Sequence, residues 1–292
     1  MESGPLKLPL VVIVGPTASG KTLLAVELAQ QFDGEIICAD SRTVYKGMDI
    51  GTAKPSAEEQ QSIPHWGLDL VEPSERFTAA DFKKYAEQKI DEIRSRGRVP
   101  FLVGGTGLYV DAVLFDYQFG GEVDSVYREE LEKMTVDELH AYCNNNNILL
   151  PENAKNKRYV IRAIEQKSIS VKGKTAPISN SIIVGIATDK EQLRTRIAKR
   201  TEQLFENGVV DEATTLGKKY SWNSEAMTGN IYRIVKSYLE GEYTLDIAKE
   251  KNTTADWRLA KRQLTWLRRN EHIRWCSLTE AKMYVSEQLA NE

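Results

Sequence analysis

Residues Gly15 to Thr22, with the sequence GPTASGKT, have the types and spacing of a phosphate-binding loop. The two glycines let backbone N–H groups turn toward an anion, the lysine supplies a mobile cation, and the threonine hydroxyl can ligate Mg²⁺. An apolar run at 10–14 precedes the loop and a helical pattern at 23–29 follows it, which is the strand–loop–helix context of this motif. The sequence therefore predicts a site for a diphosphate or triphosphate, but it does not say which molecule carries that group.

Two other segments are expected to bring functional groups to the same edge of a sheet. Residues 35–39 are typical of a short buried strand that ends at Asp40, where a carboxylate could hold Mg²⁺ or accept a proton. Helix capping is the structural alternative for this aspartate. Residues 99–103 predict another buried strand, followed by the glycine-rich turn 104–109, where backbone can approach a ligand closely. Taken alone, that turn would favour a purely structural interpretation.

Basic residues form a third group with possible chemistry. The helical pattern 191–204 places Arg196 and Arg200 four residues apart on one face, an arrangement that suits a phosphate clamp. Surface pairing with Glu191 or Glu202 is the alternative. The tail from Asp256 to Arg274, which has a helical pattern through 258–269, is also strongly basic. Such local stripes on a chain of net charge −3 indicate a confined site for a polyanion.

The alternation of strands and helices stops between 114 and 181, where the sequence is mostly helical, polar and rich in asparagine. We therefore expect an inserted helical subdomain in this region. It contains a basic and aromatic segment, 157–162, at the start of a predicted helix, for which a solvated helix face is the alternative interpretation. The apolar run 182–187 then returns the chain to the sheet.

The composition argues against several other classes of protein. Three widely spaced cysteines and three scattered histidines provide neither a disulfide framework nor a zinc site. No stretch approaches the roughly 20 apolar residues of a membrane span, and the first nine residues lack the pattern of a signal peptide. We therefore expect a cytoplasmic protein with no membrane partner.

Taken in order, these segments resemble the tRNA isopentenyltransferase family, in its bacterial form. The resemblance rests on GPTASGKT (15–22), ADSRTVYKGMDIGTAKP (39–55), IPHWGLDLVEP (63–73), FTAADF (77–82), VPFLVGGTGLY (99–109), NKRYVIRAIE (156–165) and AKRQLTWLRR (260–269). It implies an α/β fold of the P-loop NTPase-like, three-layer α/β/α kind, with a parallel central sheet and an inserted helical subdomain. Residues 1–113 and 182–292 would form the catalytic core with basic C-terminal helices, and 114–181 would form the inserted tRNA-binding subdomain.

The resemblance also implies a reaction. The dimethylallyl group of dimethylallyl diphosphate would move to N6 of the adenosine 3′-adjacent to the anticodon, in tRNAs that read codons starting with U, with release of diphosphate. Asp40 would act as the general base, and Thr106 would lie near the adenine and the leaving group. Lys21 and Arg200 would neutralise the departing diphosphate. Mg²⁺, the implied cofactor, would be held by Thr22 and Asp40.

The implied binding residues form two sets, and we expect the protein to act as a monomer. Those for the diphosphate are Gly15, Pro16, Thr17, Ala18, Ser19, Gly20, Lys21, Thr22, Arg196 and Arg200. Those for the anticodon stem-loop of the tRNA are Asp40, Ser41, Arg42, Thr43, Thr106, Arg158, Tyr159, Val160, Ile161, Arg162, Lys261, Arg262, Arg268 and Arg269.

The chain departs from the usual family pattern at positions that concern tRNA docking more than the chemistry. Lys157 stands where a proline is usual, and Trp66 stands where the second of two histidines is usual. Residues 226–233 and 255–258 also differ from the usual Gly-Tyr-Lys-Glu and Thr-Arg-x-Tyr stretches. Three other functions remain open at this point: an ATP-dependent small-molecule kinase, a prenyltransferase for free adenine nucleotides, and a non-catalytic RNA-binding protein.

Overall fold

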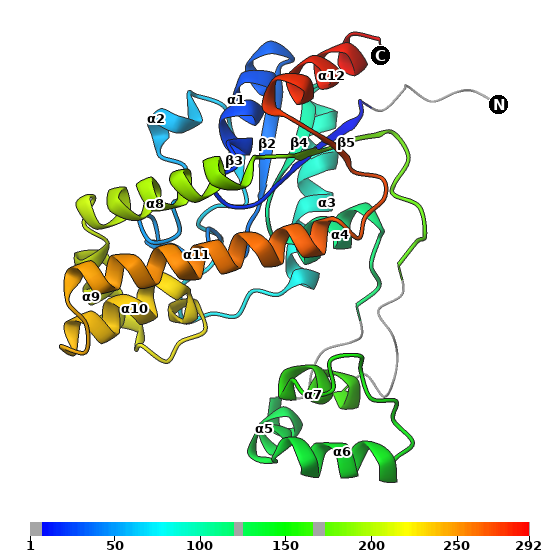
Figure 1. Cartoon of the computed structure of the whole chain (residues 1–292). Helices are drawn as coiled ribbons and strands as arrows, with labels where there is room; N and C mark the ends of the chain where they lie inside the picture. The colour runs from blue at the N-terminus through cyan, green and yellow to red at the C-terminus, as the bar shows by residue number, and fades with distance from the viewer. Residues whose placement is uncertain (1–7, 120–124, 166–172, 292) are drawn as a thin grey trace. The chain divides into compact units, whose positions relative to one another are not determined.

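The structure, a computed structural model, describes residues 8–119, 125–165 and 173–291. The chain divides into two compact units, a core formed by the segments before 115 and after 176, and a helical unit formed by Phe115–Ala176 (Figure 1). The phosphate-binding loop predicted at Gly15 to Thr22 lies in the core, whereas the basic segment 157–162 lies in the helical unit.

A six-stranded sheet with the order β3-β2-β4-β1-β5-β6 organises the core. Each described pair of neighbouring strands is parallel. The strands are β1 (Leu10–Val14), β2 (Gly34–Ala39), β3 (His65–Trp66), β4 (Val99–Gly104), β5 (Ser181–Ile186) and β6 (Arg274–Cys276). Because the strands are parallel, their carboxyl ends meet at one edge, where ligands bind in open α/β sheets. The predicted α/β fold with a parallel central sheet is confirmed.

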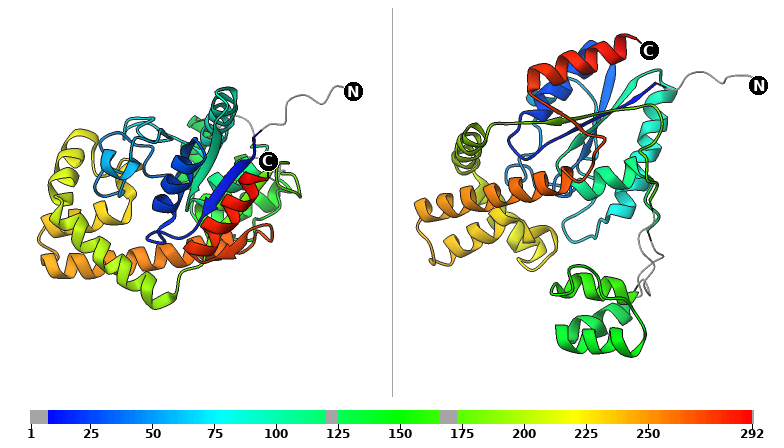
Figure 2. Two further views of the ribbon diagram at one scale, coloured as in Figure 1. Left: turned by 90° about the horizontal axis from the view of Figure 1, so that it is seen from above. Right: turned by 45° about the vertical axis from the view of Figure 1, so that its right-hand side comes forward.

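Helices cover both faces of the sheet (Figures 1 and 2). On one face, α1 (Lys21–Gln31) and α12 (Leu278–Ala290) pack on alternate strand residues such as Val11, Ile13 and Val184. On the other face lie α3 (Ala79–Ser95) and α4 (Gly107–Leu114), joined by stacking of Phe82 on Tyr109. Strands buried on both faces explain why the sequence shows continuous apolar runs there and no alternation.

The helix α3 begins with a side-chain cap. The Thr78 hydroxyl accepts a hydrogen bond from Asp81 N, and the Asp81 carboxylate accepts one from Thr78 N, which makes a capping box. The short helix α2 (Ala57–Gln60) begins with the same device, built from Ser56 and Glu59.

A group of helices that follows β5 extends the core beyond the sheet. It comprises α8 (Lys190–Glu206), α9 (Val209–Tyr220), the 3₁₀ helix η1 (Ala226–Thr228), α10 (Asn230–Leu239) and α11 (Leu245–Leu267). The longest, α11, contacts α8, α10 and α4, and is drawn in orange in Figure 1. Through these contacts, α11 connects α4, which covers the sheet, to the added helices α8 and α10.

The predicted helix through 258–269 is part of a helix that starts much earlier than predicted. The helix α11 begins at Leu245, capped by the Thr244 hydroxyl, and ends at Leu267. The Asn270 carboxamide oxygen then accepts a hydrogen bond from His272 N, a local turn that competes with helix continuation. Arg274 consequently belongs to the edge strand β6.

The helical unit has its own small core. Its helices α5 (Ser125–Lys133), α6 (Val136–Asn145) and α7 (Lys157–Glu165) enclose a buried cluster that comprises Leu131, Leu139, Cys143, Val160, Ile161 and Ile164. Arg128 on α5 forms an ion pair with Glu165 on α7, at 2.9 Å between Nη1 and Oε1. Lys157, at the position where proline is usual, donates from Nζ to the Glu132 carbonyl at 2.7 Å, close to the C-terminal end of α5. The departure at Lys157 thus has a packing reason within this unit.

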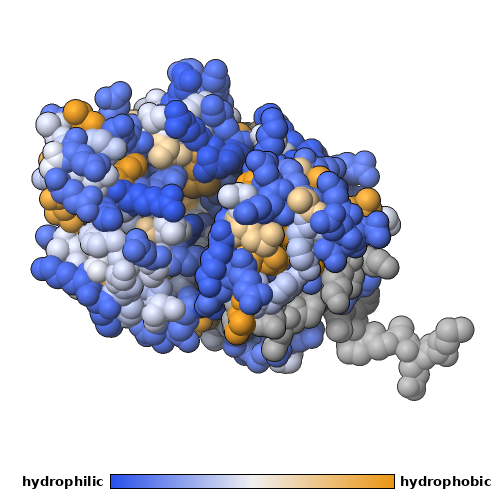
Figure 3. All heavy atoms as spheres, turned by 90° about the horizontal axis from the view of Figure 1, so that it is seen from below, coloured by the Kyte–Doolittle hydropathy of each residue, from blue (hydrophilic) through white to orange (hydrophobic). Residues whose placement is uncertain are grey.

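The surface in Figure 3 is predominantly hydrophilic, with hydrophobic side chains scattered over it. Among the described residues, no helix is both long enough and apolar enough to cross a membrane.

Candidate active site

The loop after β1 has the backbone shape that its sequence predicts. Ala18 and Gly20 adopt left-handed conformations, with φ of 62° and 91°. A Cβ atom on Gly15 would lie 2.8 Å from Ser19 Oγ, so the turn requires glycine at this position. Ser19 Oγ is buried and has no hydrogen-bond partner among the residues that the structure describes. An unpaired buried hydroxyl inside an anion-binding loop is available to a ligand.

Lys21 begins α1 and folds back over the loop, with Nζ 3.2 Å from the Pro16 carbonyl oxygen. Burial, opposed by the Asp40 carboxylate and assisted by the neighbouring Arg200, lowers the pKa of Lys21 to about 8. The positive charge is therefore poorly compensated in the free protein, and an anion bound in the loop would stabilise it.

Both arginines predicted on α8 reach the loop. Arg196 Nη1 donates to the Ser19 carbonyl at 3.1 Å, whereas Arg200 Nη1 donates to Thr17 Oγ1 at 2.5 Å. Arg200 Nη2 also lies 3.4 Å from the Thr52 carbonyl oxygen. Glu191 and Glu202, the alternative surface partners, instead pair with Arg194 and Lys249. The alternative of simple surface pairing therefore does not describe Arg196 and Arg200.

The ends of β2 and β4 meet beside this loop. The Thr106 hydroxyl accepts a hydrogen bond from Ser41 N at 3.1 Å, and Thr106 N donates to the Ala39 carbonyl at 3.2 Å. Asp40 Oδ1 accepts a hydrogen bond from Arg42 N at 2.8 Å, which closes a turn and not a helix. The helix-capping alternative for Asp40 is thus excluded, and its carboxylate is fixed next to Thr106.

A pocket of about 240 Å³ in the core joins these groups. Its lining includes Thr17 and Arg200 from the phosphate-loop side, and Asp40 and Thr106 from the strand ends. The remaining walls come from the loop at Gly51 and Thr52, from 228–232 at the start of α10, and from α11. Cations, a carboxylate and a hydroxyl therefore face one cavity, although the segments that carry them are distant in the sequence.

Sequence reasoning missed the contribution of α11 to this pocket. Gln263 Oε1 accepts a hydrogen bond from Thr17 N at 2.8 Å, and a Cβ on Gly105 would lie 2.5 Å from Gln263 Nε2. Asp256 also lines the pocket and interacts electrostatically with Arg200. Gln263 stands inside the AKRQLTWLRR segment that carried the family resemblance, which was the one signal that could have identified it.

Trp266, one turn further along α11, secures the helix to α4. Its Nε1 donates to Asp111 Oδ2 at 2.6 Å, and a side chain on Gly107 would collide with its ring. Asp111 is only 9% exposed, and this burial raises its pKa to about 6, against the opposing effects of Trp266 and Arg269.

The side chains that were expected to contact tRNA from the core lie in different environments. Arg42 donates to the carbonyls of Glu225 and Ala226 and lies 3.4 Å from Thr228 Oγ1, so its guanidinium holds the turn before α10. Thr43 is buried, which removes its side chain from the surface. Arg262 is exposed and lines the pocket, and the exposed neighbours on or next to α11 are Lys261, Arg268 and Arg269.

The five expected tRNA contacts in the helical unit also separate into two kinds. Arg158 is exposed, and Tyr159 is 48% exposed. Arg162 lies 3.9 Å from Glu165 and is partly buried. Val160 and Ile161, in contrast, are packed in the core of the unit, because α7 is strongly amphipathic and these residues fall on its apolar side. Their side chains support the helix and do not offer a surface for RNA.

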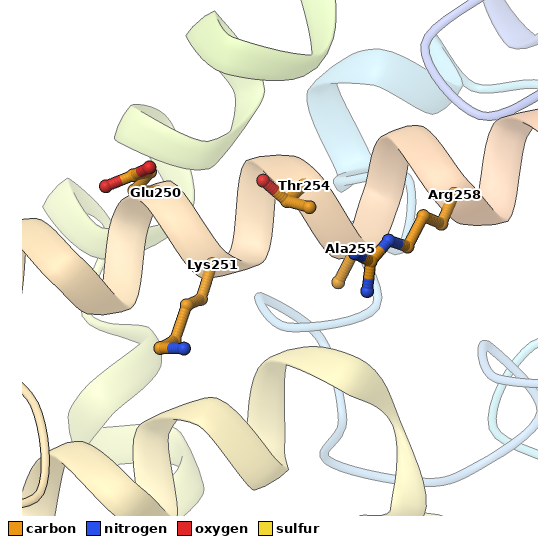
Figure 4. Close-up of a pocket in the computed structure, with 5 residues that line it drawn as sticks. All are labelled: Glu250, Lys251, Thr254, Ala255 and Arg258. Atoms are coloured by element: carbon orange, nitrogen blue, oxygen red, sulfur yellow. The ribbon is translucent and has the colours of Figure 1, made fainter.

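A second hollow, of about 320 Å³, lies along α11 and is lined by Glu250, Lys251, Thr254, Ala255 and Arg258 (Figure 4). All of its lining residues come from a single helix, and none follows the end of a strand. Lys251 and Arg258 extend from α11 on the same side of the helix in Figure 4. We regard it as an open surface groove, distinct from the pocket that contains Asp40 and Arg200.

Comparison with known proteins places the chain in a family. A family model described as IPP transferase matches residues 43–270. The chain is 41% identical over 288 residues to a tRNA dimethylallyltransferase of Acetivibrio thermocellus, covering 93% of this chain and 92% of the relative. It is 40% identical over 293 residues to one of Bacillus velezensis, covering 94% and 92%.

Solved structures agree with this relationship. A full-length tRNA isopentenylpyrophosphate transferase from Bacillus halodurans superimposes with a TM-score of 0.75 at 38% identity, covering 98% of each chain. A eukaryotic dimethylallyltransferase solved while acting on tRNA superimposes with a TM-score of 0.78 at 24% identity, covering 93% of this chain and 74% of that one, and shows the shared fold. The chain therefore belongs to the IPP transferase family.

Proposed function

We propose that this protein is a tRNA dimethylallyltransferase, which moves the dimethylallyl group from dimethylallyl diphosphate to N6 of the adenosine 3′-adjacent to the anticodon and releases diphosphate. One observation carries the proposal beyond family membership. A single pocket joins Thr17 of the phosphate loop and the Arg200 guanidinium bonded to it with a carboxylate and a hydroxyl at the ends of two neighbouring strands. The first set suits a leaving diphosphate, and the second suits an incoming amine.

The leaving group is the part of the reaction that the phosphate loop would serve. As the bond between the allylic carbon and the diphosphate oxygen breaks, its electron pair stays on that oxygen. Lys21 and Arg200 would stabilise this charge, and Ser19 Oγ could donate to a phosphate oxygen. Arg200 lines the pocket, whereas Arg196 binds the loop backbone, so we assign the direct contact to Arg200 and a supporting role to Arg196.

The incoming amine is a poor nucleophile because its lone pair is delocalised into the adenine ring. Asp40 would accept the proton that N6 loses as the new bond to carbon forms. The turn closed by Arg42 N and the contact between Ser41 N and Thr106 would hold this carboxylate and hydroxyl in place. The adenine must leave the anticodon-loop stack to enter the pocket, at a cost of a few kcal/mol that is least in a single-stranded loop.

The residues at the loop fit the implied Mg²⁺. Thr22 directly follows Lys21 on α1. Asp40 lies close enough to Lys21 for its negative charge to oppose the lowering of the Lys21 pKa, so one hydroxyl and one carboxylate flank the same loop. Among the described residues there is no group of three or more His, Cys, Asp or Glu that would form an all-protein metal cage. A small set of oxygen donors completed by substrate phosphates is typical of Mg²⁺. When bound, the ion would add positive charge next to the leaving diphosphate.

The other parts of the proposal concern partners. Exposed Arg158 and Tyr159 on α7, and Lys261, Arg262 and Arg268 at α11, would contact the anticodon stem-loop through phosphates and stacking. We further propose that the enzyme works as a monomer in the cytoplasm.

The test is a transfer assay with labelled dimethylallyl diphosphate and Mg²⁺, in which the acceptor is tRNA, AMP, or nucleosides with ATP. We expect label to enter tRNA alone. Transfer only to AMP, or phosphate transfer from ATP, would replace the proposal with one of the alternatives.

We also expect Asp40→Asn to lower turnover by at least about 100-fold, the usual scale for a general base, while tRNA still binds. The exposed Glu58→Gln on α2 is the matched control.

A further inference from the structure

Glu212 on α9 accepts hydrogen bonds from a loop and from a tyrosine that both line the pocket. Its Oε2 accepts hydrogen bonds from Asp49 N at 2.8 Å and from Ile50 N at 2.6 Å. Its Oε1 accepts one from Gly51 N at 2.8 Å and one from the Tyr232 hydroxyl at 2.8 Å. One carboxylate thus binds three consecutive backbone N–H groups and a side chain of α10, although 161 residues separate it from Gly51.

The groups that Glu212 holds are in contact with one another. A Cβ atom on Gly51 would lie 2.7 Å from the Tyr232 hydroxyl, so the loop packs directly on the tyrosine and needs glycine there. Gly51 and Tyr232 both line the pocket, whereas Glu212 is not among its lining residues. Burial, together with the neighbouring Glu212 carboxylate, raises the pKa of Tyr232, so its hydroxyl stays protonated and donates. Glu212 therefore fixes a wall of the pocket from behind.

The same loop leads to a cation of the site. Thr52, which follows Gly51, presents its carbonyl oxygen to Arg200 Nη2 at 3.4 Å, and its hydroxyl donates to the Met48 carbonyl at 2.5 Å. Arg200 Nη1 meanwhile binds Thr17 in the phosphate loop. Movement of the loop at 49–52 would consequently change the direction in which the guanidinium of Arg200 points.

We propose that Glu212 is a positioning residue for the transfer reaction: it holds residues 49–52 and Tyr232 as a wall of the pocket, and through the Thr52 carbonyl it orients Arg200 toward the diphosphate. The expected effect of Glu212 on turnover rests on the proposed function. Its expected effect on diphosphate binding does not depend on which molecule accepts the dimethylallyl group.

The first test is Glu212→Gln, which keeps the size of the side chain but replaces one acceptor oxygen with a donor that faces other donors. Binding of inorganic diphosphate with Mg²⁺, followed by calorimetry, should weaken by about 10-fold or more, the scale of one lost charge-assisted contact. The KM for dimethylallyl diphosphate should rise in the transfer assay, while the Kd for tRNA should stay within about twofold, because the hydrogen-bond partners of Glu212 are not among the residues assigned to tRNA. Asp211→Asn, an exposed carboxylate on the same helix, should change neither value.

The second test asks whether Glu212 acts through Arg200. In an Arg200→Lys background, Glu212→Gln should produce little further loss of diphosphate binding, because the shared path is already broken. Fully multiplicative losses, or a loss that follows only the fall in Tm, would overturn the proposal. If Glu212→Gln does not fold, Tyr232→Phe removes one donor alone and should show a smaller change in the same direction. Unchanged diphosphate binding in Tyr232→Phe would then count against the mechanism.

Absence of transfer to tRNA by the unmodified protein would be a different result. It would remove the proposed function but leave the diphosphate-binding test of Glu212 intact, so the two failures can be distinguished.

Discussion

At the scale of single residues, the charge of Lys21 is the property most easily tuned by the surroundings. Its ammonium is buried against the phosphate loop, close to Asp40 and Arg200. Lys21 therefore loses its proton near pH 8, where enzyme activity can be measured, whereas an ordinary exposed lysine stays charged there.

We predict that kcat/KM for dimethylallyl diphosphate falls above about pH 8. The pKa of Lys21 in the enzyme without bound diphosphate is lowered from 10.5 to about 8, so the positive charge is lost as the pH rises through that value. Steady-state rates between pH 6.5 and 10 would measure this, at a fixed saturating tRNA concentration. In Lys21→Arg, which is slower but stays charged, the alkaline decline should be absent. A wild-type profile that stays flat to pH 10 would contradict the assigned role.

The residue scale also shows what could be predicted from sequence. Lys21, Asp40 and Thr106 were identified because each stands within a short contiguous motif at the end of an apolar run. Glu212 and Gln263 were not, since their partners are 161 and 246 residues away, and the segment that contains Gln263 indicated the family without indicating the role of this residue. Val160 and Ile161 were assigned to RNA from the motif, although the periodicity of α7 places them in a core.

At the scale of elements, α11 connects parts of the site that the sheet leaves separate. Gln263 binds the phosphate loop and Trp266 binds α4, which begins right after Thr106. The start of the helix was predicted too late, because its first turns, from Leu245, lie in a polar stretch without the basic pattern that drew attention to the tail. The parallel sheet was predictable, since each central strand contains a short apolar run, whereas the two- and three-residue edge strands are too short to give a signal.

We predict that Asp111→Asn stabilises the protein at neutral pH. Burial raises the pKa of Asp111 from 3.8 to about 6, so the folded state retains a proton between these values that the unfolded chain has lost. The free energy of unfolding therefore decreases as pH rises from about 4 to about 6, and the loss persists above that range. The variant keeps an acceptor for Trp266 without this cost and should gain about 1 to 3 kcal/mol at pH 8.

Urea unfolding at pH 4 and pH 8 would measure the difference. The gain should be large at pH 8 and small at pH 4, where the wild-type carboxyl is protonated in the folded state. Equal differences at both values would mean that Asp111 is not the titrating group.

At the scale of the whole molecule, the chain combines a net charge of −3 with basic residues gathered on particular helices. Arg158 lies on α7 of the helical unit, and Arg268 follows the last residue of α11 in the core. Both are exposed. A polyanion would therefore be recognised by local stripes on each of the two units, while the overall charge limits non-specific association.

We predict that Arg158→Glu and Arg268→Glu each weaken tRNA binding and reduce its dependence on salt. The loss of one phosphate contact should lower the slope of log K against log salt by about 0.7 to 0.9 for each variant. Filter binding or fluorescence titration at several salt concentrations would measure it, with Lys84→Glu on α3, an exposed cation of the core, as the control. A slope identical to that of the control would place the residue away from the RNA.

The way the helical unit joins the core has a consequence for how such an enzyme can diversify. Ile178 N donates to the Leu114 carbonyl at 2.7 Å, and Lys174 N donates to the Phe115 carbonyl at 2.7 Å, so the outgoing and returning segments run together. Each unit also has its own buried cluster. Because backbone hydrogen bonds already hold the two ends of the insertion together, a change in its length or its replacement adds little loop-closure entropy. Such a change would also leave the register of the strands unaltered. On the proposed assignment of tRNA contacts to α7, this part of acceptor recognition could evolve separately from the bond-making chemistry.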